Sequence, residues 1–288
     1  MDCAPAPLPA FVPLGPAEPT LPVLLSVPHA GRAYLPELLA AARAPGALRT
    51  LEDPLVDQLV ADAAARGAGG IAATVPRAAI DLNRALAELD PAGIDPAPPR
   101  AGLLLTARVR GGLGLFPRST NGEALWRGLL PAAEAARRVR EIHVPYHAEL
   151  ARRLRALRDR FGAAVLLDCH SMPPLAASAS PGRVDAVIGD RHGATADRDL
   201  VRALRRSLEA SGLVVALDQR DAGGHVVERH GCPAWGLHAI QLEIDRALYL
   251  GPDGASPGPG FARTAAAIAA TVDALAAALP VPRQIAAE

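Results

Sequence analysis

Short hydrophobic runs alternate along the chain with longer stretches in which apolar residues recur at helical spacing. The hydrophobic runs cover residues 21–27, 71–75, 163–168, 183–189, 213–217 and 237–244, and the helical patterns cover residues 54–66, 125–161, 196–211 and 262–279. Short apolar strands that alternate with helices are typical of a sheet covered on both faces. The pattern therefore predicts an α/β fold with a mainly parallel sheet flanked by helices.

Proline and glycine divide this pattern. We expect Pro131 and Pro145 to break the helical segment 125–161, because proline lacks the backbone N–H and clashes with the preceding turn. Residues 90–114 are rich in Pro and Gly and are expected to form loops. We interpret residues 1–20 as a proline-rich leader, residues 21–280 as a single domain and residues 281–288 as a C-terminal tail.

The composition excludes several classes of partner. Among 288 residues, 30 Lys and Arg balance 30 Asp and Glu, and aromatic residues make up 3%. The chain thus has no basic stripe for nucleic acid and few platforms on which bases could stack. Any charged substrate must be recognised locally, so we expect a small-molecule site. The oligomeric state stays open.

Cysteine content and the N-terminal sequence favour a cytoplasmic location. Three cysteines without paired spacing occur, at Cys3, Cys169 and Cys232. An odd number of unpaired cysteines argues against a disulfide framework. The N-terminus carries an acidic residue and many prolines where a signal peptide has a basic start and an apolar run. Residues 261–279 are as long as a membrane span, but Arg263 and Asp273 interrupt them, so we expect a packed surface helix and no membrane partner.

Two of the eight histidines stand at the ends of hydrophobic strands. His29 closes "VLLSVPH" and His170 closes "AAVLLDCH". Because the carboxyl ends of parallel strands meet at one edge of a sheet, the two imidazoles are expected to converge there, as a catalytic metal requires. A zinc site of this kind takes a carboxylate as well, and Asp53 or Asp57 could supply it. Asp53 could instead cap the helix that follows, and Asp57 could face solvent.

Other residues near these strands have clear alternatives. Asp168 lies two residues before His170, so both side chains point to the same face of a strand, and the acid could orient the imidazole. Cys169 points to the opposite face, which makes a Cys–His nucleophile pair a poor interpretation. Three other histidines, His143, His147 and His192, lie in helical or loop segments with polar neighbours. We interpret them as structural or solvated histidines.

Three further motifs could bind or activate an anionic substrate. In "RAAIDLNR", Arg77 and Arg84 bracket Asp81 and Asn83, and this cluster could hold a carboxylate or form a surface ion-pair network. In "HAIQLEIDRALYL", Glu243 interrupts an apolar alternation near the end of a strand, as a paired buried charge or a catalytic acid/base. The paired glycines of "AGGHVVERHG" suggest a mobile loop that carries two histidines.

Six motifs together resemble one family. "SVPHAGR", "EDPLVDQL", "RAAIDLNR", "LLDCHSMP", "GGHVVERHG" and "HAIQLEIDRALYL" occur in the order found in the N-formylglutamate amidohydrolases, or deformylases, and span residues 21–250. The family is similar in fold to the zinc carboxypeptidases and the aspartoacylase group. The resemblance implies a mixed, mainly parallel sheet flanked by helices, with one catalytic zinc ion.

The resemblance also implies a role for each motif. It assigns zinc binding to His29 and His170. Because Arg32 stands where the relatives usually have a glutamate, three residues after the first histidine, the third ligand must come from elsewhere, and Asp53, which matches the family's aspartate in this helix opening, is preferred to Asp57. The resemblance assigns the substrate's carboxylate to Asn83 and Arg84, the oxyanion to Arg77 and the general base to Glu243. The substrate's side-chain carboxylate would be bound by His225 and Arg229, or by an arginine at position 108, 110 or 118.

The activity implied by the resemblance is the hydrolysis of N-formyl-L-glutamate to formate and glutamate, the last step of one route of histidine degradation. Two alternatives remain at this point. One is a metal-dependent deacylase of another small anionic acyl-amino acid or peptide. The other is a non-catalytic ligand-binding relative, which would lack Glu243 or a zinc histidine, whereas this chain keeps candidates for all of them.

Overall fold

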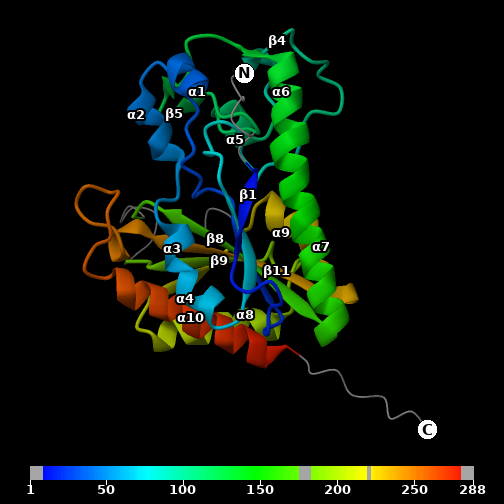
Figure 1. Ribbon diagram of the computed structural model, residues 1–288, viewed down its shortest axis with the longest axis vertical. Coiled ribbons are helices and arrows are strands. Elements are labelled where there is room, and N and C mark those ends of the chain that lie inside the picture. The colour runs from blue at the N-terminus through cyan, green and yellow to red at the C-terminus, as the bar shows by residue number, and fades with distance from the viewer. Residues whose placement is uncertain (1–8, 175–182, 219–221, 280–288) are drawn as a thin grey trace, which may run out of the picture. The chain divides into compact units, whose positions relative to one another are not determined.

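A computed structural model describes residues 9–174, 183–218 and 222–279 (Figure 1). The chain divides into two compact units. Unit 1 comprises Met1–Val12, Pro28–Glu52 and Ala72–His147, and unit 2 comprises Pro13–Val27, Asp53–Ile71 and Ala148–Glu288. The domain boundaries expected from the sequence stay predictions, and the C-terminal tail 281–288 lies outside the described residues.

A seven-stranded sheet forms the centre of the fold. Its order is β1-β3-β2-β8-β11-β9-β10. The strands are β1 Phe11–Leu14, β2 Val23–Val27, β3 Gly69–Ala73, β8 Ala164–Met172, β9 Ala186–Gly189, β10 Val215–Leu217 and β11 Leu237–Asp245. β2, β8 and β11 are parallel neighbours, β9 and β10 are also parallel, and β9 runs antiparallel to β11. The predicted mixed, mainly parallel sheet is confirmed.

The central strands are buried because both of their faces are covered. All of β2 is buried, and so is β8 except for its last residue. In unit 2 the long helix α10, Phe261–Ala278, contacts α8, Arg198–Ala210, and the short helices α3, Val56–Leu59, and α4, Ala61–Ala65. Helix α9, His225–His230, contacts β8 and β11. In the view of Figure 1, α8 and α10 lie below the strands and α9 lies above them.

Helix α10 is long and apolar enough to cross a membrane by length and composition. Its apolar side chains, among them Ile268, Val272 and Leu275, are instead buried in unit 2, where the helix contacts α8 and α4. One side of the helix is therefore packed in unit 2 while Arg263 and Asp273 are exposed, as expected of a packed surface helix.

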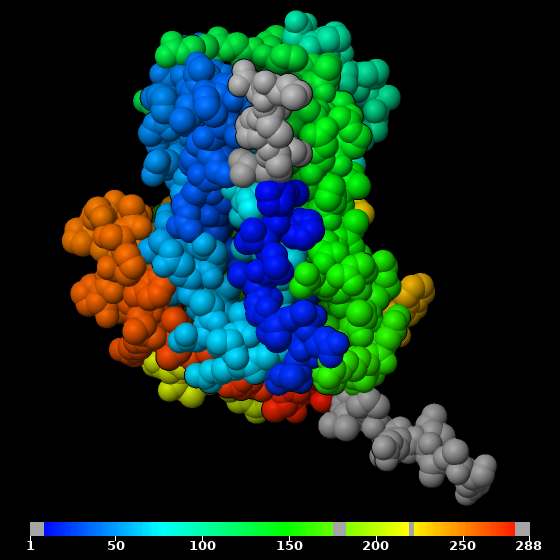
Figure 2. All heavy atoms as spheres, viewed as in Figure 1, coloured from blue at the N-terminus to red at the C-terminus, as the bar shows by residue number. Residues whose placement is uncertain are grey.

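The described part of the proline-rich segment adds an edge strand, β1, which the sequence pattern does not predict. Further along, the amides of Thr20 and Leu21 both donate to the carbonyl of Gly67, and Arg160 donates to the carbonyl of Pro19. Figure 2 shows this part of unit 2 on the surface, between the α3–α4 segment and α7, Val144–Phe161. The segment is therefore extended over the surface, as its prolines suggest.

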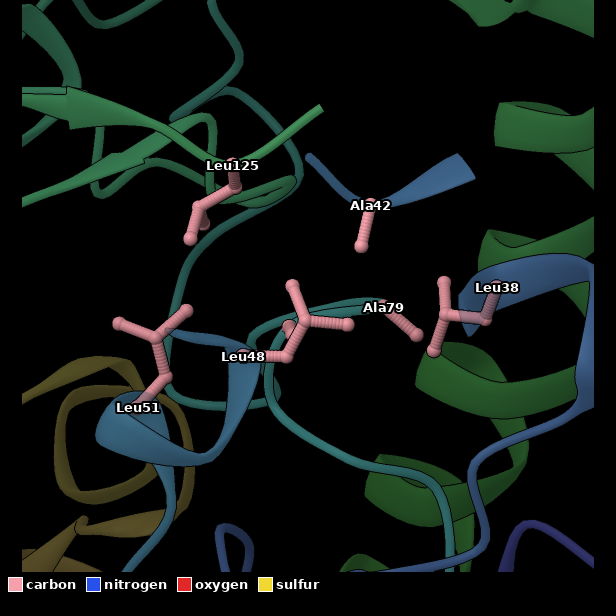
Figure 3. Packing of buried hydrophobic residues seen from close by; sticks show 7 residues of the cluster. Leu38, Ala42, Leu48, Leu51, Ala79 and Leu125 are labelled. Atoms are coloured by element: carbon pink, nitrogen blue, oxygen red, sulfur yellow. The ribbon is translucent and has the colours of Figure 1, made fainter. Parts of the chain in front are cut away.

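Unit 1 consists mainly of short elements and loops. They are the helices α1 Pro36–Ala41, α2 Pro45–Leu48, η1 Arg49–Leu51, η2 Pro91–Gly93, α5 Ala107–Arg110 and α6 Ala132–Arg138, and the paired strands β4 Ile94–Asp95 with β7 Leu130–Pro131 and β5 Ser119–Thr120 with β6 Glu123–Ala124. Leu38, Ala42, Leu48, Leu51 and Leu125 pack together with two alanines in a buried cluster (Figure 3). Unit 1 therefore has an apolar core of its own.

The expectation that Pro145 breaks the long helical segment is wrong. Helix α6 begins directly after Pro131, as expected, but it continues through a π-helical turn, η3 Val139–His143, into α7. Pro145 is the second residue of α7, where its missing N–H would have bonded one turn back. The wide turn lies immediately before the proline and lets the helix run on to Phe161.

Candidate active site

Polar side chains in unit 2 line one face of three neighbouring strands near their carboxyl ends. Ser26 of β2 is level with Asp168 of β8, and Asp168 is level with Gln241 of β11. Two residues further on, His170 is level with Glu243. Because side chains alternate along a strand, these residues share one face. The ends of the strands thus bring an acid, an imidazole and a second acid together.

His170 lies between two carboxylates. Its Nε2 is 2.7 Å from Oδ2 of Asp168, and its Nδ1 is 3.1 Å from Oδ2 of Asp53. Ser26 donates to the other oxygen of Asp168 at 2.7 Å. The prediction that Asp168 and His170 share a face is confirmed, and Asp168 is in place to orient the ring.

Asp53 is buried and is bound from several sides. Its Oδ1 accepts hydrogen bonds from Ser171 and from Arg246, both at 3.1 Å. The N-cap position of α3 is Leu55, so the helix-cap interpretation of Asp53 is wrong. Asp57 lies inside α3 and is half-buried. Of the two acids considered from the sequence, Asp53 is therefore the one that contacts His170.

The surroundings of His170 favour positive charge. Burial alone disfavours the imidazolium, but the carboxylates of Asp168, Asp53 and Glu243 raise the pKa of His170 well above its ordinary value. A site that stabilises a proton in this way is also suited to a cation, because the same carboxylates offset the charge of either.

Glu243 is half-buried near the end of β11, and Gln241 donates to its Oε1 at 3.0 Å. The amide oxygen of Gln241 in turn accepts from the backbone N–H of Gly224, at 2.8 Å. This contact links Glu243 to the paired glycines of the "AGGHVVERHG" motif. The motif is not the loop expected from the sequence: His225–His230 form α9, which begins directly after Gly224.

In unit 1 a buried aspartate is surrounded by basic groups. Asp81 accepts from Nε2 of His29 at 2.8 Å and from Nε of Arg77 at 2.9 Å, and Nε of Arg84 lies 3.9 Å from it. The side chain of Asp81 is 0% exposed and that of His29 is 2% exposed. Burial opposes the charge of Asp81, but Arg77, His29 and Arg84 outweigh it and hold the pKa of Asp81 well below its usual range.

Asn83 and Arg84 are buried in a tight turn that Asp81 closes. The backbone N–H of Asn83 donates to Oδ1 of Asp81 at 2.8 Å, and Arg84 donates to the carbonyls of Asn83 and Leu113. The "RAAIDLNR" motif is thus a buried cluster, so its interpretation as a surface ion-pair network is wrong, while its binding of a carboxylate stays a prediction.

The chain after His29 is anchored by a close backbone approach. A Cβ at Gly31 would lie 2.2 Å from the carbonyl oxygen of Val75, so that no other residue fits without a shift of the backbone. Ala33 donates to the carbonyl of Thr74 next to this contact. The glycine of "VPHAGR" therefore fixes the path of the segment that carries His29.

The other residues singled out in the sequence take several positions. His143 and His147 are buried, with 2% and 1% exposure, whereas His192 has a side chain that is 75% exposed. Arg229 is exposed on α9, and Arg118 is paired with Asp90. The exposure of His192 fits its solvated interpretation, whereas the interpretation of His143 and His147 as structural stays a prediction.

Cys169 is unsuited to nucleophilic chemistry. It is buried on β8, and its thiol donates to the carbonyl of Leu167 at 3.6 Å. Burial, with a smaller contribution from Asp168, raises the pKa of the thiol, so the thiolate is disfavoured. These surroundings argue against a thiol hydrolase that uses Cys169 as its nucleophile.

A cavity of about 560 Å³ lies within unit 1. Its lining includes Leu38, Ile94, Phe116, Arg118 and Trp126. None of the residues assigned to zinc, the oxyanion, the base or the substrate's α-carboxylate lines this cavity. We therefore do not assign the reaction to it.

Sequence reasoning missed three side chains of the unit 2 cluster. Ser26, Gln241 and Arg246 hold Asp168, Glu243 and Asp53 respectively. A signal was present for the first two: each is a polar residue inside an apolar strand, and Gln241 and Glu243 share the period of two that puts them on one face.

Comparisons with known proteins identify a family for this chain. The family model of N-formylglutamate amidohydrolases matches residues 21–250. An N-formylglutamate deformylase from Pseudomonas putida is 35% identical over 240 residues, and one from Pseudomonas aeruginosa PAO1 is 32% identical over 235 residues; each match covers 80% of this chain and 82% of the relative. The crystal structure of an N-formylglutamate amidohydrolase from Ralstonia eutropha JMP134 is similar with a TM-score of 0.87 and 32% identity, covering 94% of this chain and 99% of that one.

Proposed function

Because the chain belongs to the N-formylglutamate amidohydrolase family, we propose that it hydrolyses N-formyl-L-glutamate to formate and L-glutamate, with one zinc ion bound by His29, Asp53 and His170. The observation that carries the proposal is that each of the two histidines has a ring nitrogen held by a buried carboxylate. We place the reaction in the cytoplasm, as the last step of a route of histidine degradation.

The two carboxylate–histidine pairs support a metal site. Nε2 of His29 is bound by Asp81 in unit 1, and Nε2 of His170 is bound by Asp168 in unit 2. Histidines that ligate metals almost always give their second ring nitrogen to a carboxylate, a carbonyl or water, which fixes the ring and its tautomer. In both histidines Nδ1 is then the ligand atom.

The separation of Asp53 and His170 also fits a shared ion. Nδ1 of His170 and Oδ2 of Asp53 are 3.1 Å apart. Two ligands of one tetrahedral zinc ion, each at about 2.0–2.1 Å, lie roughly 3.3–3.4 Å from each other. The pair therefore needs only a small adjustment to bind zinc.

The path of the chain supports His29 as the third ligand. Strand β2 ends at Val27, one residue beyond Ser26, which is level with Asp168. His29 follows Val27 after two peptide bonds, each of which spans at most 3.8 Å between Cα atoms. This short connection supports our proposal that His29 supplies the third ligand.

Zinc at these ligands would lower the pKa of a bound water to about 7 and polarise the formyl carbonyl. Glu243 would accept a proton from the attacking water and pass it to the departing nitrogen, which leaves as the free amine of glutamate. The amide of Gln241 holds Oε1 of Glu243 during both transfers. Formate takes the oxygen of the water, and the C–N bond breaks.

The unit 1 cluster would bind the anionic parts of the substrate. Arg77, held through its Nε by Asp81, would stabilise the oxyanion that forms on the formyl oxygen. Asn83 and Arg84 would bind the α-carboxylate. We assign the side-chain carboxylate to His225 and Arg229, at the start and the outer face of α9.

Formate release from N-formyl-L-glutamate, combined with metal analysis, tests this proposal. The wild type should contain about one zinc ion per chain and release formate. Glu243→Gln should lower kcat by roughly 10²- to 10⁴-fold, the usual contribution of a general base, and keep its zinc. Glu209→Gln, on the exposed face of α8, is the matched control.

A panel of acyl-amino acids extends the test to the substrate. Faster turnover of an N-acetyl or N-formyl derivative of another amino acid would keep the metal hydrolase but replace its substrate. A protein that binds no zinc and hydrolyses no acyl-amino acid would refute the enzyme assignment in favour of a non-catalytic binding relative.

A further inference from the structure

The turn that carries Asn83 and Arg84 has buried carbonyl groups that no sheet or helix can satisfy. The carbonyl of Leu82 accepts from Nε2 of His147 at 2.9 Å, and the carbonyl of Arg84 accepts from Nε2 of His143 at 2.9 Å. Between them, the carbonyl of Asn83 accepts from Arg84 itself at 2.9 Å. Buried carbonyls need such partners, because an unmade hydrogen bond is costly away from water.

The helix that supplies these donors contacts the same segment a third time. Nη1 of Arg138 donates to the carbonyl of Ala79 at 2.8 Å, while Glu134, one turn earlier, binds the guanidinium of Arg138 through its Nε. Arg138, His143 and His147 thus form a row of donors along unit 1. They hold carbonyls on both sides of Asp81 and on both sides of Asn83.

The π-helical turn places the three donors in one row. Arg138 and His143 are five residues apart, which on a regular α-helix turns the second side chain by about 140° relative to the first. In η3 the N–H of Val144 bonds to the carbonyl of Val139, so that this turn holds one residue more than a regular α-helical turn and reduces the rotation between Arg138 and His143. The regular spacing of four residues then brings His147 onto the same face.

We propose that Arg138, His143 and His147 are positioning residues for substrate binding, which hold the Asp81–Arg84 turn in the form that binds the α-carboxylate. This inference rests on the proposed function in assigning that carboxylate to Asn83 and Arg84. The two imidazoles act as N–H donors, and Nε2 carries a proton in both the neutral ring and the charged ring when it donates to a carbonyl. Their action is therefore independent of their charge.

Paired substitutions at position 147 test the role. His147→Gln keeps an N–H donor at a similar reach, whereas His147→Leu removes the donor and strands the carbonyl of Leu82. We expect His147→Leu to raise KM for N-formyl-L-glutamate roughly tenfold or more, with kcat changed less than about threefold, and His147→Gln to restore KM to within about threefold of the wild type.

A second substrate separates positioning from general damage. N-formyl-4-aminobutyrate lacks the α-carboxylate and keeps the side-chain carboxylate. The wild type and His147→Leu should hydrolyse it with values of kcat/KM within about twofold of each other, because the group that the turn binds is missing. An equal loss on both substrates would show that the histidine is merely structural.

Further variants guard against misfolding. His238→Leu removes another buried histidine, which accepts a hydrogen bond from the backbone N–H of Asp197; it should lower Tm but leave KM unchanged. If His147→Leu does not fold, KM can be measured for His143→Leu and Arg138→Met, which remove the other two donors to the same turn.

Calorimetric binding of L-glutamate gives a readout that needs no turnover. If the wild type binds glutamate but releases no formate, the proposed function fails, and weaker binding by His147→Leu with recovery in His147→Gln still supports positioning. If the wild type does not bind glutamate at all, the turn is not a carboxylate site and the positioning role is refuted with it. Unchanged affinity in the His147→Leu variant also refutes it.

Discussion

Two buried clusters, one in each unit, have the same construction with opposite charge. In unit 2 the imidazole of His170 is buried among the carboxylates of Asp53, Asp168 and Glu243, and its pKa is raised. In unit 1 the carboxylate of Asp81 is buried among His29, Arg77 and Arg84, and its pKa is lowered. In each cluster, burial opposes the charge of the central group, and the charges of the surrounding partners outweigh the effect of burial.

This difference separates two tasks that a hydrolase of an anionic amide needs. The acid-rich surroundings of His170 suit a cation, and the base-rich surroundings of Asp81 suit the negative charges of a substrate. A single mixed cluster would neutralise itself, whereas two separate clusters can each keep an excess of one sign. The predictions below alter one cluster at a time.

Removing the centre of the basic cluster should have the largest effect. Asp81→Asn leaves Arg77 and Arg84 without their buried counter-charge, and loss of one partner from a buried ion pair costs about 3–5 kcal/mol. Urea unfolding should report this loss as a lower midpoint. Asp90→Asn, whose partner Arg118 has a side chain that is 37% exposed, should cost less than about 1 kcal/mol. Equal losses in the two variants would contradict the assigned role of Asp81.

Removing a proposed ligand from the acidic cluster should act on metal content. Asp53→Asn should weaken zinc binding by more than the roughly 10–100-fold that loss of a ligand's hydrogen-bond partner costs. Asp57→Asn, in the first turn of α3, should retain zinc. Competition against a chelator of known affinity measures both. A protein in which Asp57→Asn loses zinc and Asp53→Asn keeps it would reverse the choice of third ligand.

Removing only the orienting acid should have a smaller effect on the metal. Asp168→Asn keeps the shape of the contact with Nε2 of His170 but loses the negative charge, so zinc affinity should fall by roughly 10–100-fold. Ser26→Ala, which removes the donor to Asp168, should lower it by less. The same chelator competition ranks the two variants, and an unchanged affinity for Asp168→Asn would mean that His170 needs no orienting acid.

The buried imidazole of His230 sharpens the comparison, because burial there outweighs the opposite contribution of the Asp168 carboxylate. Burial, with a contribution from Arg229, lowers the pKa of His230 to about 3. The unfolded chain takes up a proton near pH 6.5, whereas folded His230 stays neutral down to about pH 3. Its stabilising contribution is therefore present above pH 6.5 and is lost as the pH falls towards 3.

The measurable consequence is the slope of the free energy of unfolding against pH. Between pH 6 and 4, His230 should lower the free energy of unfolding by about 1.4 kcal/mol for each unit of pH, and His230→Gln should lack this component. Denaturant unfolding of both proteins at pH 6.0 and 4.5 measures the difference. Parallel pH dependences would mean that His230 is protonated in the folded state.

The sequence predicted those parts of the fold and site that depend on local pattern. The strands that carry Ser26, Asp168 and Glu243 were each recognised as an apolar run, and the alternation of β8 placed Asp168 and His170 on one face. The chemistry of the site could also be predicted, because ligands bind at the carboxyl ends of strands in α/β sheets and histidines and acids stand there in this sequence. Six ordered motifs then indicated the family.

Features that depend on tertiary contacts could not be predicted in this way. The division into two compact units leaves no mark in the composition, since the chain passes between them several times. Whether Asp53 caps a helix or contacts His170 is decided by Ser171 and Arg246, which are far away in sequence. The burial of His143 and His147 depends on the turn at Leu82–Arg84, which lies some sixty residues earlier.

The π-helical turn before α7 makes this helix sensitive to its length rather than to its composition. Arg140 and Glu141 are exposed, so single substitutions there should be tolerated. Deleting either residue would restore a regular helix in which Arg138 and His143 are four residues apart and stay on one face. Inserting a residue would instead rotate Arg138 away from the row of donors. The row of donors would thus tolerate many replacements in this stretch, and the loss of one residue, but not the gain of one.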